Sequence, residues 1–226
     1  MDYSKRPIIT IKNISKTYDV GGTVVKALDN ISFEISKSNF LMITGRNGSG
    51  KSTLLHQLGL LDYSDSGEII IDGQDVNKLP EKERAKLRLR KIGYIFQEYA
   101  LIAELSALEN VMLPAMMLEK TSTVKKRAEE FLALVSLKQK AYRLPTQLSG
   151  GEQQKVAIAR ALINHPSIIF ADEPTANLDS KSSKDLLNIF QKLNQEENHT
   201  IVMVTHEEEE LAFASRVIKL IDGRIA

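Results

Sequence analysis

A glycine-rich segment that follows a short apolar run has the residue types of a phosphate-binding loop. It consists of Gly45, Arg46, Asn47, Gly48, Ser49, Gly50, Lys51, Ser52 and Thr53. Glycines let several backbone N–H groups converge on a phosphate, and a helix that starts at the end of the loop adds unpaired N–H groups and a favourable dipole. Lys51 can neutralise the β- and γ-phosphates, and the Ser52 hydroxyl can ligate Mg²⁺. The segment predicts binding of a nucleoside triphosphate, a feature that kinases, GTPases, recombinases and transporters share.

Two adjacent acids, Asp172 and Glu173, end an apolar run that begins at Ile168. Consecutive residues of a strand point to opposite faces, so both acids reach one site only if the strand ends there, and Pro174 helps to end it. Asp172 is then a candidate Mg²⁺ ligand, and Glu173 is a candidate base that orients and deprotonates a water molecule. Alone, the pair could equally be an acidic strand end. Together with the phosphate loop, it predicts hydrolysis of the nucleotide.

A third segment, Ser149, Gly150 and Gly151, opens a predicted helix that runs to Leu162. Ser149 suits the N-cap, and Glu152 follows three residues later, as in a capping box. Taken alone, the segment is best explained as the start of a well-capped helix. The two glycines are poor helix formers, however, and they allow an anion to approach closely, which leaves a binding role open.

Apolar patterns indicate the strands that must position these residues. Ile31, Phe33 and Ile35 alternate with polar residues, as in a strand with one buried face. Further strands are predicted at 8–14, 41–44, 69–72, 92–97, 168–172, 201–205 and 217–221. Strands alternate with helices in the last third of the chain, which favours a largely parallel sheet covered on both faces.

Helical periodicity fills most of the remaining chain. A helix is predicted from Val124 with Ser122 as its N-cap, because apolar residues recur there on one face. The stretch 101–118 is apolar and predicted to be helical in part, with an interruption at Pro114. A helix with Leu186 on its apolar face should lie between two of the late strands.

Composition limits the classes of protein to which the chain can belong. Of its 226 residues, 42% are hydrophobic and 26% are charged, which is ordinary for a globular protein. The net charge of +1 gives no general argument for a nucleic-acid partner, and the absence of cysteine excludes disulfides. Residues 1–7 lack the apolar run of a signal peptide, and no stretch approaches the roughly 18 apolar residues of a membrane-spanning helix.

In this order, the three motifs resemble those of the ABC transporter ATPase family, and the resemblance runs over almost the whole chain. It identifies four further positions. Tyr18 matches the aromatic residue that stacks on adenine, and Gln97 matches a glutamine at a strand end between the two halves. Asp179 closes a short segment after the two acids, and His206 follows a late strand.

The resemblance implies a role for each of these residues, with ATP as the nucleotide and Mg²⁺ as the metal. The implied catalytic residues are Glu173, His206, Gln97 and Lys51, and the implied metal ligands are Ser52, Gln97 and Asp172. The implied nucleotide-binding set is Tyr18, the whole loop from Gly45 to Thr53, Ser149, Gly150, Gly151 and Asp179.

The implied fold is an α/β P-loop NTPase with a largely parallel sheet core, an N-terminal antiparallel β part and an inserted helical subdomain. The chain is then a single ABC ATPase domain over residues 1–226. Its catalytic core should comprise about 1–97 and 163–226, and its helical subdomain about 98–162.

The resemblance also implies two partners and a location. One partner is a second copy of the chain in a head-to-tail homodimer, where each ATP lies between the phosphate loop of one copy and Ser149–Gly151 of the other. The second is an integral membrane permease, which places the chain at the cytoplasmic face of the membrane as a peripheral protein. The apolar stretch 99–105 is the predicted permease contact, with ordinary core packing as the alternative. No nucleic-acid partner is expected.

Finer similarity points to the branch that serves lipoprotein release, macrolide efflux and antimicrobial-peptide export. It is carried by residues 105–111 and 171–179, whereas Arg46, Asn39 and the four acids 207–210 depart from that branch. The four acids are interpreted as a helix N-terminus. Two alternatives stay open: an importer subunit, and a soluble ABC ATPase without a transport role. The stretch between Thr53 and Leu148 shows no sustained heptads, which disfavours a DNA-repair type with a long coiled coil.

Overall fold

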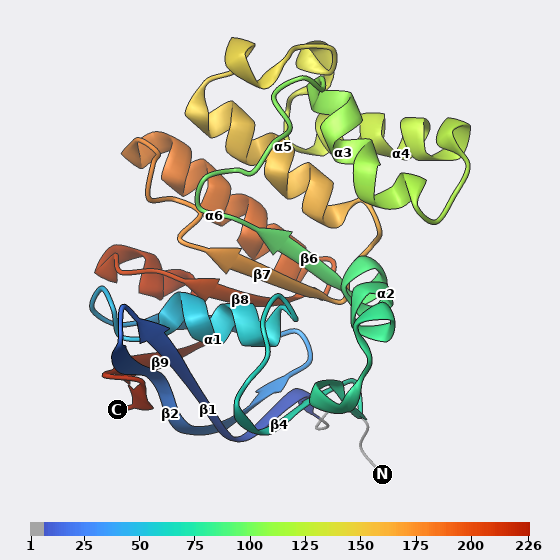
Figure 1. The fold of residues 1–226 in the computed structure, drawn as a ribbon. Coiled ribbons are helices and arrows are strands. Elements are labelled where there is room, and N and C mark those ends of the chain that lie inside the picture. The colour runs from blue at the N-terminus through green and yellow to red at the C-terminus, as the bar shows by residue number, and fades with distance from the viewer. Residues whose placement is uncertain (1–6) are drawn as a thin grey trace.

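The computed structural model describes residues 7–226 and contains two β-sheets with helices packed around them (Figure 1). The prediction that residues 1–7 lack the apolar run of a signal peptide falls on residues 1–6, which lie outside the described range, and on Pro7. Within that range, the antiparallel sheet and the group of helices α3, α4 and α5 lie at opposite ends of the molecule, with the larger sheet between them.

The larger sheet has six strands in the order β10-β9-β3-β8-β7-β6. They are β3 (Phe40–Thr44), β6 (Ile92–Ile95), β7 (Ile168–Asp172), β8 (Thr200–Val204), β9 (Arg216–Ile221) and β10 (Arg224–Ile225). The pairs from β9 to β6 are parallel, and β10 pairs with β9 in the antiparallel direction. The carboxyl ends of β3, β6, β7 and β8 therefore share one edge, where parallel sheets commonly bind ligands.

The smaller sheet has the order β2-β1-β4-β5 and is antiparallel throughout. Its strands are β1 (Pro7–Val20), β2 (Thr23–Ser36), β4 (Ser66–Ile71) and β5 (Gln74–Asp75). Ile31, Phe33 and Ile35 of β2 point into the core, as their alternation predicts. The predicted combination of a parallel core with an N-terminal antiparallel part is confirmed.

Within residues 7–226, six α-helices and several short 3-10 helices complete the fold. The α-helices are α1 (Lys51–Leu58), α2 (Glu81–Lys91), α3 (Ala107–Met116), α4 (Thr121–Leu134), α5 (Gly150–Leu162) and α6 (Ser180–Gln195). The 3-10 helices are η2 (Val76–Lys78), η3 (Lys138–Lys140), η4 (Pro145–Gln147) and η5 (Glu208–Phe213). Helices α3, α4 and α5 pack against one another, and their boundary as a separate subdomain at 98–162 stays a prediction.

Side chains along β3 point alternately to the two faces of the larger sheet, and each face borders its own hydrophobic core. Leu41 and Ile43 face a core that contains α1 and the antiparallel sheet. Phe40 and Met42 face a second core built with α3, α4, α5 and α6. Helix α1 is thus held between the two sheets (Figure 1), so the phosphate loop at its N-terminus has a rigid base.

Two predictions of helix boundaries are wrong. Helix α4 begins at Thr121 with Lys120 at the N-cap, so Ser122 lies inside the first turn and cannot cap it. Pro114 lies within α3 and does not interrupt it. The missing N–H of Pro114 removes a single bond, to the carbonyl four residues earlier, and the helix ends soon afterwards at Met116. The start of α3 is fixed instead by a capping box at Ser106.

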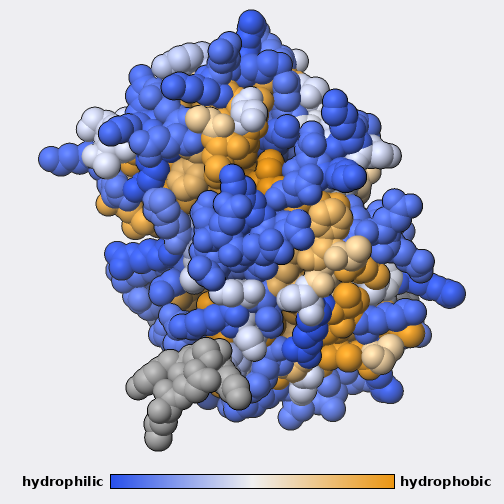
Figure 2. All heavy atoms as spheres, turned by 180° about the vertical axis from the view of Figure 1, so that it is seen from behind, coloured by the Kyte–Doolittle hydropathy of each residue, from blue (hydrophilic) through white to orange (hydrophobic). Residues whose placement is uncertain are grey.

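The surface opposite to the view of Figure 1 is mainly hydrophilic. Figure 2 shows hydrophilic residues over most of this face, with hydrophobic residues gathered in patches between them. Among residues 7–226, none of the helices combines the length and the hydropathy needed to cross a bilayer.

We expect Asn110→Ala to unfold at a markedly lower urea concentration than the wild type, because its free energy of unfolding should be lower by about 2–4 kcal/mol. The Asn110 side chain is fully buried, and its Nδ2 donates to the carbonyls of Ile102, Leu105 and Ser106 at 2.9–3.1 Å. Its Oδ1 accepts from the N–H of Ile102 at 2.8 Å. Truncation removes the partner of the Ile102 N–H and of the Leu105 carbonyl, whereas the carbonyls of Ile102 and Ser106 each keep a backbone hydrogen bond. Gln139→Ala, which removes an exposed amide, is the control, and an equal midpoint for both variants would contradict this account.

Candidate functional site

The phosphate loop connects the end of β3 to the start of α1, as the sequence predicts. It packs so closely on its neighbours that two of its glycines have no space for a side chain. A Cβ on Gly45 would lie 2.3 Å from the carbonyl oxygen of Leu220, and one on Gly50 would lie 2.3 Å from that of Ala27. Gly50 also has a φ of 99°, which L-residues rarely adopt. The loop is therefore clamped between β2 and β9 with its backbone in one shape.

Lys51 lies inside the loop, with only 5% of its surface exposed. Its Nζ donates to the carbonyl oxygens of Gly45 and Arg46 at 3.0 and 3.2 Å, and lies 3.7 Å from Oε1 of Glu173. A buried ammonium that is surrounded by loop carbonyls and faces a carboxylate is a strong centre for anion binding.

Ser52 and Asp172 place two oxygen atoms side by side at the end of the loop. The Ser52 hydroxyl donates to Oδ1 of Asp172 at 3.0 Å. Burial raises the pKa of Asp172, while the hydrogen bond from Ser52 and the nearby His56 act against that rise. Hydroxyl and carboxylate oxygens are the ligands that Mg²⁺ prefers, so this pair fits the predicted metal. Among residues 7–226, no group of three or more His, Asp or Glu could hold a metal alone, so phosphate and water oxygens would complete the shell.

Glu173 lies directly beyond β7, where the strand ends as predicted. Its φ is 40°, a conformation that is strained for a residue other than glycine and that turns the side chain toward the same site as Asp172. Its N–H donates to the carbonyl of Val204 at 3.1 Å, which ties it to β8. Oε2 of Glu173 lies 3.1 Å from Nδ1 of His206. The structure therefore joins Lys51, Glu173 and His206 in one row of contacts.

The sequence analysis missed two neighbours of this row. Oε1 of Glu207 lies 3.1 Å from Nε2 of His206, so a carboxylate faces each ring nitrogen. Nε2 of His56 lies 3.8 Å from Oδ2 of Asp172. His56 could have been found, because it follows Ser52 by four residues and thus shares its face of α1. The predicted helix N-terminus at 207–210 is a short 3-10 helix that begins at Glu208.

Gln97 lies shortly after β6, at the same edge of the sheet. Its carbonyl oxygen is 3.5 Å from Nδ2 of Asn177, which links this loop to the segment after the two acids. Among the residues that the structure describes, its side chain makes no hydrogen bond to Ser52 or Asp172. Its assignment as a metal ligand and catalytic residue stays a prediction.

Tyr18 lies at the end of β1 with about a third (36%) of its surface exposed. Its hydroxyl donates to Oδ2 of Asp62 at 2.7 Å. Burial and this carboxylate raise its pKa to about 12, and the Thr53 hydroxyl acts against the rise. The phenol therefore stays protonated and lies beside the end of the phosphate loop, which is where a base attached to bound phosphates would extend.

Ser149 caps α5 as predicted, in a capping box with Glu152. A Cβ on Gly150 would lie 2.8 Å from Oη of Tyr99, and one on Gly151 would lie 3.2 Å from Oγ of Ser182. Within one chain, the described contacts of this segment are with the Gln97 loop and α6, and they do not include the phosphate loop. The N-terminus of α5 is thus free to face another chain.

Asp179, predicted as a nucleotide-site residue, is the N-cap of α6. It accepts hydrogen bonds from the N–H groups of Lys181 and Ser182 and from the Ser182 hydroxyl, at 2.7–3.1 Å. Hydrogen bonds from Ser182, through its backbone and its side chain, lower the pKa of Asp179. The role of Asp179 in a nucleotide site between two copies stays a prediction.

We expect Asp179→Ala to lower the melting temperature by about 2–4 °C, because α6 loses its cap. Asp179→Ser keeps a capping oxygen and should melt like the wild type. Asp179→Ser separates the capping role from the predicted contact between copies. If this variant keeps the wild-type melting temperature but loses ATPase activity, the loss is explained by the contact between copies. A melting temperature that Asp179→Ala leaves unchanged would contradict the capping role.

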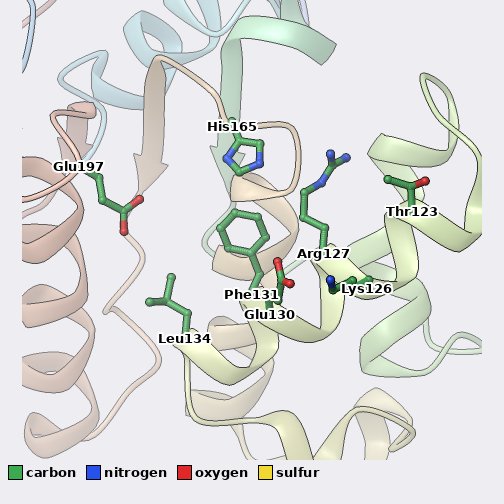
Figure 3. A pocket seen from close by; sticks show the side chains of 8 residues that line it. All are labelled: Thr123, Lys126, Arg127, Glu130, Phe131, Leu134, His165 and Glu197. Atoms are coloured by element: carbon green, nitrogen blue, oxygen red, sulfur yellow. The ribbon is translucent and has the colours of Figure 1, made fainter.

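A separate hollow of about 460 Å³ lies between α4 and the loop that follows α5. Its side chains are Thr123, Lys126, Arg127, Glu130, Phe131, Leu134, His165 and Glu197 (Figure 3). Phe131 and His165 face each other with ring centroids 5.5 Å apart, and Arg127 is held by Glu119 in a paired hydrogen bond. None of the predicted site residues lines this hollow, so it lies outside the candidate site.

Comparison with known sequences agrees with the geometry. The sequence model of the family described as ABC transporter matches residues 28–176. An uncharacterized ABC transporter ATP-binding protein of Methanocaldococcus jannaschii is 49% identical over 219 residues, which cover 96% of this chain and 97% of that protein. The macrolide export ATP-binding/permease protein MacB of Chlorobium luteolum is 47% identical over 219 residues, 97% of this chain. The chain spans about a third (33%) of that relative's length.

Comparison with solved structures extends the agreement to the fold. A dimeric post-hydrolysis state of the ATP-binding cassette MJ0796, bound to ADP and Pi, matches with a TM-score of 0.90 and 43% identity over 96% of both chains. The predicted P-loop NTPase fold is confirmed by this match. The chain belongs to the ABC transporter family, as one of its ATP-binding cassettes.

Proposed function

We propose that this chain binds ATP at the carboxyl edge of its parallel sheet, hydrolyses it as a homodimer and thereby drives a membrane permease. The observation that carries the proposal is the row formed by Lys51, Glu173 and His206 beside the pair of Ser52 and Asp172. It combines an anion-binding lysine, a carboxylate base with an orienting imidazole, and two oxygen ligands for a metal. The division into a core at about 1–97 and 163–226 and a helical part at about 98–162 is part of the proposal.

Each residue of the row has a defined task in this mechanism. Lys51 and the loop N–H groups bind the β- and γ-phosphates and neutralise their charge. Glu173 accepts a proton from the water that attacks the γ-phosphorus, and His206 keeps the carboxylate in place through its Nδ1 contact of 3.1 Å. Mg²⁺, held by Ser52 and Asp172 when bound, supplies charge neutralisation on the phosphates. Gln97 is proposed as a further ligand at this point.

The second copy completes each site. The N-terminus of α5, with Ser149, Gly150 and Gly151, does not contact the phosphate loop of its own chain. Its unpaired N–H groups and dipole would bind the γ-phosphate held by the other chain. ATP would then favour the closed dimer and ADP would not, because only ATP offers that phosphate. The relative MJ0796 forms a dimer, which supports this arrangement.

A membrane permease is the proposed partner, at the cytoplasmic face of the membrane. One supporting feature is a hollow of about 350 Å³ between α2, β6, α3 and α5. Its lining includes Arg88, Leu89, Pro114, Met117 and Asn164, and Met117 is 76% exposed. The stretch 99–105, predicted from the sequence as the permease contact, lies outside this lining, and Leu101 packs against the core. A role of that stretch stays a prediction.

The macrolide-export relatives support an export or efflux role over import. The names of those relatives combine an ATP-binding and a permease part, and this chain matches about a third of their length. We infer that the chain serves the same kind of system, with lipoprotein release and peptide export as neighbouring possibilities of the same branch.

Three measurements test the proposal. Turnover of ATP by the purified chain should require Mg²⁺ and disappear with EDTA, and Asp172→Asn should lower the affinity for Mg²⁺. Tagged Glu173→Gln, expressed in its native host and purified with ATP from gently solubilised membranes, should bring down an integral membrane protein in near-stoichiometric amount. Recovery of soluble partners alone would support the soluble ABC ATPase and contradict the transport role.

A further inference from the structure

The loop between α1 and β4 carries an acid, Asp62, that touches the nucleotide site although it belongs to none of the motifs. Oδ2 of Asp62 accepts from the hydroxyl of Tyr18 at 2.7 Å and from Nε2 of Gln57 at 3.0 Å. Oδ1 accepts from Nζ of Lys16 at 3.2 Å and from the N–H of Tyr63 at 2.7 Å. One carboxylate thus joins β1, α1 and its own loop through four donors.

The loop itself is fixed from the other side by α2. Arg84 is 1% exposed, and its Nη2 donates to the carbonyl oxygen of Asp62 at 2.6 Å. Its guanidinium also lies 3.8 Å from the ring centroid of Tyr63. Nη1 of Arg88 donates to the carbonyl of Leu60 at 2.7 Å. Because backbone and side chain are both held, the Asp62 carboxylate is a fixed acceptor rather than a mobile surface charge.

Tyr18, in contrast, lies near the tip of an exposed hairpin. The neighbouring residues Val20 and Val24 are 64% and 72% exposed, so packing does little to hold this end of β1 and β2. The ring of Tyr18 is held from one end by Asp62 and lies 5.2 Å from Nζ of Lys16, which Asp62 also binds. Without these contacts the ring would have several rotamers available, and a ligand that stacks on it would have to select one.

We propose that Asp62 is a positioning residue of the nucleotide site, which holds the Tyr18 ring in the orientation that receives the base. The inference rests on the proposed function, in which Tyr18 stacks on adenine. Asp62 has no hydrogen bond to Lys51, Ser52, Asp172 or Glu173. Asp62 reaches the site through Tyr18 and through Gln57 of α1. We expect its effect to fall on the base, and a ligand without a base tests whether the phosphate loop is affected through Gln57.

The test compares a nucleotide with a ligand that has no base. In Asp62→Ala, the KM for ATP should rise about 3- to 10-fold, the cost of immobilising one side chain on binding. The kcat should stay at the wild-type value, and so should the dissociation constant of inorganic tripolyphosphate. Tyr18→Phe removes the same hydrogen bond and leaves the other three donors of Asp62 in place, so its KM should rise in the same way even if Asp62→Ala folds poorly.

Asp65→Ala is the matched control. Asp65 lies on the same loop and accepts from the N–H of Thr17 at 2.7 Å, but it has no hydrogen bond to the Tyr18 side chain. The KM of Asp65→Ala for ATP should match that of the wild type. The KM of the double variant Asp62→Ala, Tyr18→Phe should be no higher than that of Asp62→Ala, because the hydrogen bond between Tyr18 and Asp62 is already lost there.

Three outcomes would overturn the inference. Equal loss of ATP and tripolyphosphate affinity in Asp62→Ala and Tyr18→Phe would show that the contact supports the loop and not the base. A wild-type KM for ATP in both Asp62→Ala and Tyr18→Phe would show that the hydrogen bond between the two residues does not position the ring for binding. A wild-type KM in Tyr18→Ala would refute the stacking role in the proposed function, and this result is distinguishable because it appears without any change at Asp62.

Discussion

Glu173→Gln should reduce ATP turnover by about 10²- to 10⁴-fold, the range for the loss of a general base. The amide cannot accept a proton from water, yet it has nearly the same shape and can still contact His206. Binding of ATP should therefore survive, and the nucleotide-bound dimer should accumulate because the γ-phosphate is no longer removed. Steady-state release of phosphate, measured with saturating Mg²⁺ and ATP, gives the decrease directly.

The control for this variant is Glu208→Gln, which makes the same replacement of a carboxylate by an amide at an exposed acid in η5. It should hydrolyse ATP at the wild-type rate. If Glu173→Gln kept more than a tenth of the wild-type turnover while Glu208→Gln was normal, the base would have to be another residue.

Lys51→Ala should weaken ATP binding by about 10- to 100-fold, because a charged hydrogen-bond donor to phosphate is lost. Lys51 is 5% exposed and lies among the loop carbonyls, so no other lysine or arginine of the loop can replace it in the same place. Arg46, the other cation of the loop, is exposed. Titration of the purified chain with ATP by calorimetry measures the effect.

Lys12→Ala is the matched control, because Lys12 is an exposed cation that pairs with Glu68 on the antiparallel sheet. It removes one positive charge without touching the site, so the affinity should not change. Equal weakening by both substitutions would mean that overall charge, and not the position of Lys51, determines binding.

The parts of the site that could be predicted are those whose chemistry is local in the sequence. The phosphate loop is a continuous segment in which backbone N–H groups, Lys51 and Ser52 act together, so its pattern is visible without a structure. Asp172 and Glu173 are adjacent for a similar reason, because the end of one strand brings both to the same place. The cap at Ser149 depends on contacts within a single turn.

The parts that could not be predicted depend on contacts between distant segments. Tyr18 and Asp62 are 44 residues apart and meet because α1, which precedes the Asp62 loop, packs against the antiparallel sheet that contains β1. Glu207 was interpreted as the start of a helix, although its side chain lies beside His206. The two wrong helix predictions, at Ser122 and Pro114, used residue preferences that packing in the second core overrides.

The central claim is that ATP, and not ADP, joins two copies of this chain through the N-terminus of α5. The most direct test is the mass of Glu173→Gln in sedimentation experiments with Mg²⁺ and ATP, with ADP, and without nucleotide. The account predicts about twice the chain mass of 25.3 kDa with ATP and a monomer in the other two conditions. Gly151→Asp should abolish the dimer, because it places a negative charge where the phosphate would bind but keeps a favourable residue in the first turn of α5. A monomer with ATP, or a dimer that forms equally with every nucleotide and in Gly151→Asp, would contradict the account.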